Sequence, residues 1–248
     1  ILSELRPSLV LDIGCGTGEP MVDFLNAGHA VLGIDKSPEM ITKAQANLAA
    51  ANFEPSLVSF GDMEMPEGLP EEPFDCFVAL GAVYYAEKFG VTMRGLVDRL
   101  PPGGHFIFSL RNELFSLFSL NNYTKRFFED RLVPYEEIDK DLKFRVDLFF
   151  SERLGQLEQK RNFETVDTLG VHSIMHNPLT VEKEVLVPAG LELISLSFYH
   201  YHPLPPVFEH TDPEVFRKFA AASEVPDDWR GHFMASSFVV HARKPNPS

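Results

Sequence analysis

The sequence predicts an α/β protein built on a doubly wound, mostly parallel sheet. Short apolar runs alternate with segments of helical pattern from residue 8 to residue 110, as expected for strands joined by crossover helices. The apolar run Val10–Ile13 leads directly into the glycine-rich segment Gly14–Gly18. Glycines at this spacing favour a tight turn between a strand and the helix that follows it.

The first 110 residues divide into elements at recognisable start and stop signals. Pro20 suits the first turn of a helix and Gly28 its exit, whereas Ser37 and Pro38 form an N-cap with proline at the first helical position. The expected strands are residues 8–13, 29–35, 56–60, 74–80 and 105–110, and the expected helices are residues 20–27, 38–51 and 87–100.

The sequence changes character after Arg111, where phenylalanine becomes frequent. Residues 142–150 and 161–174 are predicted to be strands joined by a turn at Gly155, so residues 111–178 should form an antiparallel, β-rich insertion. A helix, a strand, a second helix and a last strand should follow, at residues 181–187, 191–199, 213–223 and 236–243.

The bulk properties exclude several classes of protein. The 248 residues, 44% of them hydrophobic, suit one globular α/β domain with a sizeable insertion, or one domain and a small cap. The formal net charge of −14 argues against nucleic acid and anionic membranes as partners, because both are held by basic surfaces. We find no signal-peptide pattern and no apolar run that could span a bilayer. Cys15 and Cys76 are expected to be reduced thiols of a cytoplasmic protein.

The glycine-rich segment differs from a dinucleotide fingerprint, which has the spacing G-x-G-x-x-G. Here the spacing is G-x-G-x-G, and Asp12 stands two residues before the first glycine. The segment resembles the first motif of the class I S-adenosylmethionine-dependent methyltransferases, and the resemblance covers residues 8 to about 110. The alternative is a glycine-rich turn of another nucleotide-binding α/β protein.

The resemblance implies a fold, a cofactor and a division into parts. The fold would be a Rossmann-like, seven-stranded sheet, and the cofactor would be S-adenosylmethionine. Residues 1–110 and 179–248 would form the cofactor-binding methyltransferase domain, and residues 111–178 would be a substrate-cap insertion. Because the chain begins with Ile1 rather than Met, we expect it to be trimmed.

Several candidate cofactor residues stand at the ends of the expected strands. Asp35 ends the second strand, where an acid can accept hydrogen bonds from both ribose hydroxyls, although capping of Ser37 is a competing role. By resemblance, Asp12 reaches the amino-acid end of the cofactor, unless it caps a helix. Asp62 and Met63 would contact the adenine, unless they only form a turn. The full predicted set is Asp12, Gly14, Cys15, Gly16, Gly18, Asp35, Lys36, Asp62, Met63 and Leu80, where Gly18 could serve packing alone.

The candidate catalytic residues are two tyrosines and two histidines. Tyr84 and Tyr85 follow the fourth strand, where one aromatic ring could face the sulfonium. His172 and His176 precede the resumed helix, and histidine is the usual base for a hydroxyl acceptor at neutral pH. The alternative for each histidine is a satisfied or solvent-facing residue. His200 and His202 share strand spacing, but no third ligand accompanies them, so no metal is expected.

These observations predict methyl transfer to a small or medium organic acceptor, such as a ring-containing metabolite or a natural-product scaffold. The absence of an Asn-Pro-Pro-Tyr segment after the fourth strand, the signature of amino-group methylation on bases and glutamine, favours a small acceptor. The alternatives are a non-catalytic S-adenosylmethionine-binding partner protein and a protein methyltransferase. A homodimer is a further possibility.

Overall fold

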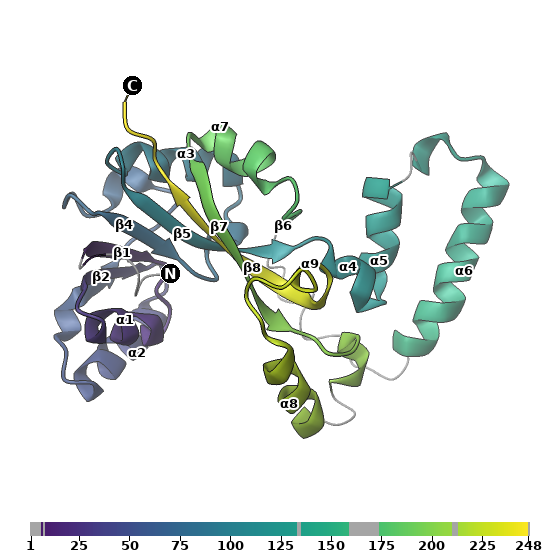
Figure 1. The fold of residues 1–248 in the computed structure, drawn as a ribbon, viewed down its shortest axis with the longest axis horizontal. Coiled ribbons are helices and arrows are strands. Elements are labelled where there is room, and N and C mark those ends of the chain that lie inside the picture. The colour runs from purple at the N-terminus through teal and green to yellow at the C-terminus, as the bar shows by residue number, and fades with distance from the viewer. Residues whose placement is uncertain (1–5, 7, 133–134, 159–173, 210–212, 248) are drawn as a thin grey trace.

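The computed structural model describes residues 6, 8–132, 135–158, 174–209 and 213–247 (Figure 1). Its centre is a sheet in the order β3-β2-β1-β4-β5-β8-β7, with the short strand β6 paired to β5. The strands are β1 (Leu9–Ile13), β2 (Ala30–Asp35), β3 (Val58–Phe60), β4 (Cys76–Ala79), β5 (His105–Asn112), β6 (Met175–His176), β7 (Glu192–Tyr201) and β8 (Ala235–Arg243). The pairs among β1 to β5 are parallel, and β8 runs antiparallel to both β5 and β7.

Helices cover both faces of this sheet. The helices are α1 (Glu19–Asn26), α2 (Pro38–Ala50), α3 (Phe89–Arg99), α4 (Phe115–Ser119), α5 (Asn122–Phe127), α6 (Lys140–Glu158), α7 (Val187–Ala189), α8 (Pro213–Ser223) and α9 (Gly231–Met234). One core joins the sheet to α1 and α2 through Met21 and Leu48, and the other joins it to α3 through Met93 and Leu96. The predicted doubly wound α/β sheet is therefore confirmed.

The predicted helix signals operate as expected. Ser37 caps α2 by accepting a hydrogen bond of 3.4 Å from the Met40 N–H, and proline follows it. The predicted helix 213–223 coincides with α8, and the predicted strands of the sheet differ from the observed ones by a few residues at their ends.

The prediction of a β-rich insertion is wrong for the residues that the structure describes. Residues 142–150, predicted as a strand, lie inside α6, and so does Gly155, predicted as a turn. The many phenylalanines favoured a strand, yet the segment also contains Lys, Leu and Arg, which are good helix formers. Asp147 fixes α6 to its neighbours through an ion pair of 2.8 Å with Lys125 and a hydrogen bond of 3.1 Å from Tyr135. Residues 161–173 of the second predicted strand lie outside the described residues.

A second segment, between β7 and β8, was not predicted to lie beside the insertion. Its helices α8 and α9 lie on the same side of the molecule as α4, α5 and α6, beyond the ends of β5 and β8 (Figure 1). Asn112, at the end of β5, joins the two segments. Its buried carboxamide donates to the carbonyls of Gly231, His232 and Ala235 at 3.2, 2.8 and 2.8 Å and accepts from the Leu114 N–H at 3.0 Å.

Within the described residues, no helix combines the length and the apolar character that crossing a membrane requires.

A pair of histidines links β5 to β8 inside the sheet. Nδ1 of His105 and Nε2 of His241 lie 2.9 Å apart and share one hydrogen bond. Burial, and to a smaller extent the neighbouring His105, lower the pKa of His241 from 6.5 to about 4. Burial also lowers the pKa of His105. Both folded-state pKa values are thus below those of the unfolded chain, so the unfolded state binds more protons as the pH falls below 6.5.

This pair predicts a loss of stability in mild acid. The His241 contribution should make the free energy of unfolding about 2 kcal/mol smaller at pH 5 than at pH 7.5. Urea unfolding of wild type and His241→Gln at the two pH values measures the effect, and the variant should show a smaller difference between them. His200→Gln, at an exposed histidine, serves as the control and should keep the wild-type difference. If the free energy of unfolding depends equally on pH in all three proteins, the pair of His105 and His241 is not the cause of that dependence.

Candidate functional site

The glycine-rich turn joins β1 to α1 and is tied to the neighbouring strand. Gly14 and Cys15 donate their backbone N–H groups to the Ile34 carbonyl at 2.8 and 3.0 Å. A Cβ at Gly14 would lie 2.7 Å from the Cβ of Ala82, so this position requires glycine. At Gly16, φ is +55° and an added Cβ would meet no protein atom within 4 Å. The turn is therefore open on the side of Gly16, where a ligand can approach the backbone.

The Asp35 carboxylate holds this turn against the start of α2. Its Oδ2 accepts from the Gly16 N–H at 2.9 Å, and its Oδ1 accepts from the Ser37 N–H at 2.8 Å. The capping role considered as an alternative is thus present. A carboxylate has about four acceptor positions, so these two bonds leave capacity for a ligand.

Asp12 is buried beside the turn with one oxygen unpaired. The residue is 3% exposed, and its Oδ2 has no hydrogen-bond partner among the described residues. Burial, and to a smaller extent the negative charge of Asp35, raise the pKa of Asp12 from 3.8 to about 7. Helix capping does not explain this residue, because α1 begins without a side-chain cap. A buried, unpaired carboxyl oxygen suits a donor group on a bound ligand.

A first cavity of about 160 Å³ opens at the carboxyl ends of β1, β2, β3 and β4. The residues that line it are Gly14, Asp35, Lys36, Gly61, Asp62, Met63, Gly81, Ala82 and Tyr85. The structure thus brings together five of the ten predicted cofactor residues. Asp62 also forms the predicted turn, by accepting from the Glu64 N–H at 3.0 Å.

The other five predicted cofactor residues, the buried Asp12 among them, do not line this cavity. Gly16 belongs to the turn itself. Cys15 packs in the core, where burial raises the pKa of its thiol to about 12. An added Cβ at Gly18 would lie 3.0 Å from the Cβ of Ala44, which supports the packing role considered for Gly18. Leu80 packs against the same core as Cys15.

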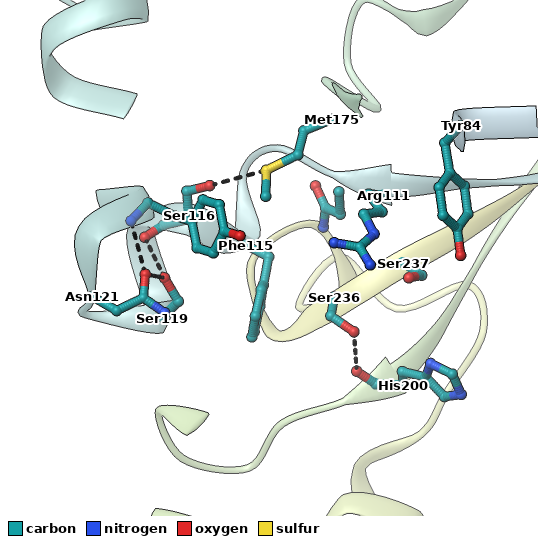
Figure 2. Close-up of a pocket in the computed structure, with 12 residues that line it drawn as sticks. Tyr84, Arg111, Phe115, Ser116, Ser119, Asn121, Met175, His200, Ser236 and Ser237 are labelled. Carbon is teal, nitrogen blue, oxygen red and sulfur yellow. Dashed lines mark hydrogen bonds between the residues drawn. The ribbon is translucent and has the colours of Figure 1, made fainter. Parts of the chain in front are cut away.

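A second, larger cavity of about 390 Å³ lies at the ends of β5, β7 and β8 (Figure 2). Its lining consists of Tyr84, Arg111, Asn112, Phe115, Ser116, Ser119, Asn121, Tyr123, Met175, His200, Ser236 and Ser237. Apart from Tyr84, none of these was predicted as a site residue. The one available signal was the position of Arg111 and Asn112 at the end of a parallel strand, where α/β sheets bind ligands.

Tyr84 and Tyr85 form the boundary between the two cavities. Tyr85 lines the first cavity and Tyr84 the second, and their ring centroids are 4.5 Å apart. The guanidinium carbon of Arg111 lies 5.4 Å from the centroid of Tyr84 and 5.8 Å from that of Tyr85. Burial raises the pKa of the Tyr84 hydroxyl well above its ordinary value, and Tyr85 raises it further. The Tyr84 hydroxyl therefore stays protonated at neutral pH.

The histidines considered as bases have different surroundings. His172 lies outside the described residues. His176 lines neither cavity; its ring packs on Phe89 at 4.5 Å, and burial lowers its pKa to about 4. It is therefore neutral and only weakly basic at neutral pH. The ring of His202 packs on Phe115 and Phe216, and His200 lines the second cavity. No cluster of three potential metal ligands occurs among the described residues.

Sequence comparison finds similar proteins for residues 11–108 and their surroundings. A family model described as a methyltransferase domain matches residues 11–108. An uncharacterized protein of Haemophilus influenzae is 31% identical over 112 residues, which are 44% of each chain. The tRNA U34 carboxymethyltransferase of a Shewanella strain is 34% identical over 109 residues, 43% of this chain and 32% of that enzyme. The chain thus matches less than half the length of these relatives.

Solved structures share the fold over nearly the whole chain. An S-adenosylmethionine-dependent methyltransferase from Mesorhizobium loti aligns with a TM-score of 0.54 and 17% identity, over 97% of this chain and 92% of that one. The magnesium protoporphyrin IX methyltransferase of Synechocystis, with bound S-adenosylhomocysteine, aligns with a TM-score of 0.53 and 15% identity, over 97% and 76%. Together with the glycine-rich turn and the first cavity, these matches support a methyltransferase domain over residues 11–108 and show that the chain shares its fold with S-adenosylmethionine-dependent methyltransferases.

Proposed function

We propose that this chain transfers a methyl group from S-adenosylmethionine to a small or medium organic acceptor bound in the second cavity. The observation that carries the proposal is the pair of adjacent cavities with Tyr84 and Tyr85 between them. Transfer in line requires the donor and the acceptor to approach from opposite sides of one boundary. A cavity of about 390 Å³ is within the size range of small-molecule sites.

The residues around the first cavity fit the cofactor. Asp35 has acceptor capacity for ribose hydroxyls, and Asp62 and Met63 line the same cavity for the adenine. The unpaired oxygen of Asp12 suits the amino group at the other end of the cofactor. The bound sulfonium supplies an already activated methyl group, so alignment and exclusion of water are the main tasks of this chain.

Among the candidate catalytic residues, we assign alignment to the tyrosines. Tyr84 keeps its proton and can donate a hydrogen bond to the acceptor, and Tyr85 lines the cofactor side of the boundary. His172, which lies outside the described residues, stays the predicted base for an acceptor that must lose a proton. His176 lines neither cavity, and its lowered pKa makes it a weak base. Residues 111–178 stay the proposed substrate cap. We add to this cap the connection between β7 and β8, because His200 and Ser236, at its two ends, line the second cavity.

A macromolecular acceptor is the second candidate. The matched Shewanella enzyme modifies tRNA, and another structural neighbour comes from a complex with the Trm112 methyltransferase activator of Haloferax volcanii. The formal net charge of −14 disfavours tRNA. The other expectations from the sequence also stay predictions. They are the alternative of a non-catalytic S-adenosylmethionine-binding partner protein, the formation of a homodimer and the cytoplasmic location.

The choice of acceptor class is testable by labelling. The protein is incubated with S-adenosylmethionine labelled on its methyl group and with cell extract separated into small molecules, tRNA and protein. We expect label in the small-molecule fraction and no salt-sensitive retention of tRNA in a filter assay. Label in tRNA or protein would contradict the proposal of a small-molecule acceptor, but it would still support methyl transfer by this chain.

Asp35 should dominate the affinity for the cofactor. Asp35→Ala removes the charged acceptor of the ribose hydroxyls and releases the Gly16 N–H, so binding should weaken by about 2–4 kcal/mol. Calorimetric titration with S-adenosylhomocysteine measures this loss. Asp23→Ala, at an exposed acid on α1, is the matched control and should bind normally. Normal affinity in a folded Asp35→Ala protein would exclude Asp35 from the site.

The open side of Gly16 should be a cofactor contact. Gly16 and Gly28 both have positive φ, +55° and +90°, and a Cβ added at either meets no protein atom within 4 Å. Gly16→Ala and Gly28→Ala therefore introduce similar backbone strain, and only the first places a methyl group at the proposed site. We expect at least a tenfold loss of affinity, about 1.4 kcal/mol, in Gly16→Ala alone. Equal affinities in the two variants would mean that the turn does not hold the cofactor.

A further inference from the structure

The second cavity contains one charged cation and no carboxylate. Twelve described residues line it, and none of them is Asp or Glu. Arg111 is the one lining residue whose side chain carries a permanent positive charge. In a chain with a formal net charge of −14, this composition distinguishes the cavity from the average surface.

The Arg111 guanidinium has unused hydrogen-bond donors. It forms no ion pair within the described part of the chain. The carboxylate two residues further on, Glu113, is paired with Arg131. One guanidinium nitrogen donates to the Tyr85 hydroxyl at 3.5 Å, whereas a guanidinium carries five N–H donors. A half-buried cation with donors left over suits an anionic ligand.

Neighbouring strands hold the backbone of Arg111 in place. Arg111 pairs with Ser237 of β8 and with Met175 of β6, so β5 is hydrogen-bonded on both sides at this residue. The rings of Tyr84 and Tyr85 lie under the guanidinium. Figure 2 shows Arg111 between Tyr84 and the α4 residues Phe115 and Ser116. The free donors therefore lie inside the second cavity, next to its boundary with the first.

We propose that the methyl acceptor is a small molecule that bears a carboxylate, and that Arg111 binds this carboxylate in the second cavity. The proposal rests on the function proposed above and adds the chemical class of the acceptor. The planar fork of a guanidinium matches two carboxylate oxygens. One guanidinium balances the single charge of a carboxylate but only about half the charge of a phosphate monoester. The hydroxyl of Ser237, in the same lining, can support the bound group.

The experiment compares carboxylates with neutral isosteres. The probes are benzoate and indole-3-acetate, their carboxamides benzamide and indole-3-acetamide, and phenyl phosphate. Binding is measured by chemical-shift titration, with and without S-adenosylhomocysteine. We expect each carboxylate to bind wild type at least about tenfold more tightly than its carboxamide. Arg111→Gln should lose this preference, and Arg111→Lys, which keeps the charge without the fork, should retain part of it.

Arg94→Gln provides the control for the loss of a positive charge, because Arg94 is exposed on α3 and lines neither cavity. It should keep the wild-type preference. The proposal is overturned if wild type shows no preference for carboxylates, if the preference survives in Arg111→Gln, or if phenyl phosphate binds more tightly than benzoate. Titration with S-adenosylhomocysteine separates the two proposals. Failure of wild type to bind it would refute the proposed function, whereas normal binding without a carboxylate preference would refute only this inference.

Discussion

The buried carboxamide of Asn112 is the interaction on which the second cavity depends. It connects the end of β5 to three carbonyls between Gly231 and Ala235 and to the first turn after the strand. Without these partners the buried carboxamide of Asn112 would itself be unpaired, and an unpaired buried polar group costs about 1–3 kcal/mol. Because the insertion and the β7–β8 connection meet at this residue, both walls of the cavity are positioned by one side chain of the sheet.

The first cavity depends in the same way on Asp35, whose carboxylate joins the glycine-rich turn to the start of α2. The capping role and the proposed ligand role of this residue are therefore compatible. The bonds to Gly16 and Ser37 orient the carboxylate before a ligand arrives, which reduces the ordering required on binding. Tyr84, Tyr85 and Arg111 then join the two cavities into one proposed site.

Local sequence signals account for the parts that were predicted well. Proline at the start of α2, the serine cap and the glycine turn each act over a few residues, so they are visible in the sequence. Residues 142–150 were predicted wrongly because phenylalanine favours strands locally, while the contacts of Asp147 with Lys125 and Tyr135 hold this segment as a helix. Such contacts between separate elements override weak propensities.

For the first 110 residues, the sequence by itself determined the order of strands and helices, the glycine-rich turn and the acids at the strand ends, because these features depend on local backbone geometry and on hydrophobic pattern. Only the tertiary structure decided which side chains share the second cavity. Arg111, His200 and Ser237 come from β5, β7 and β8, and they meet because antiparallel pairing aligns the ends of these strands. No local pattern encodes that register, since it arises from the pairing of Ser237 with both Arg111 and Tyr199, which are distant from it in the sequence. The same arrangement leaves Arg111 without an acidic partner among the described residues.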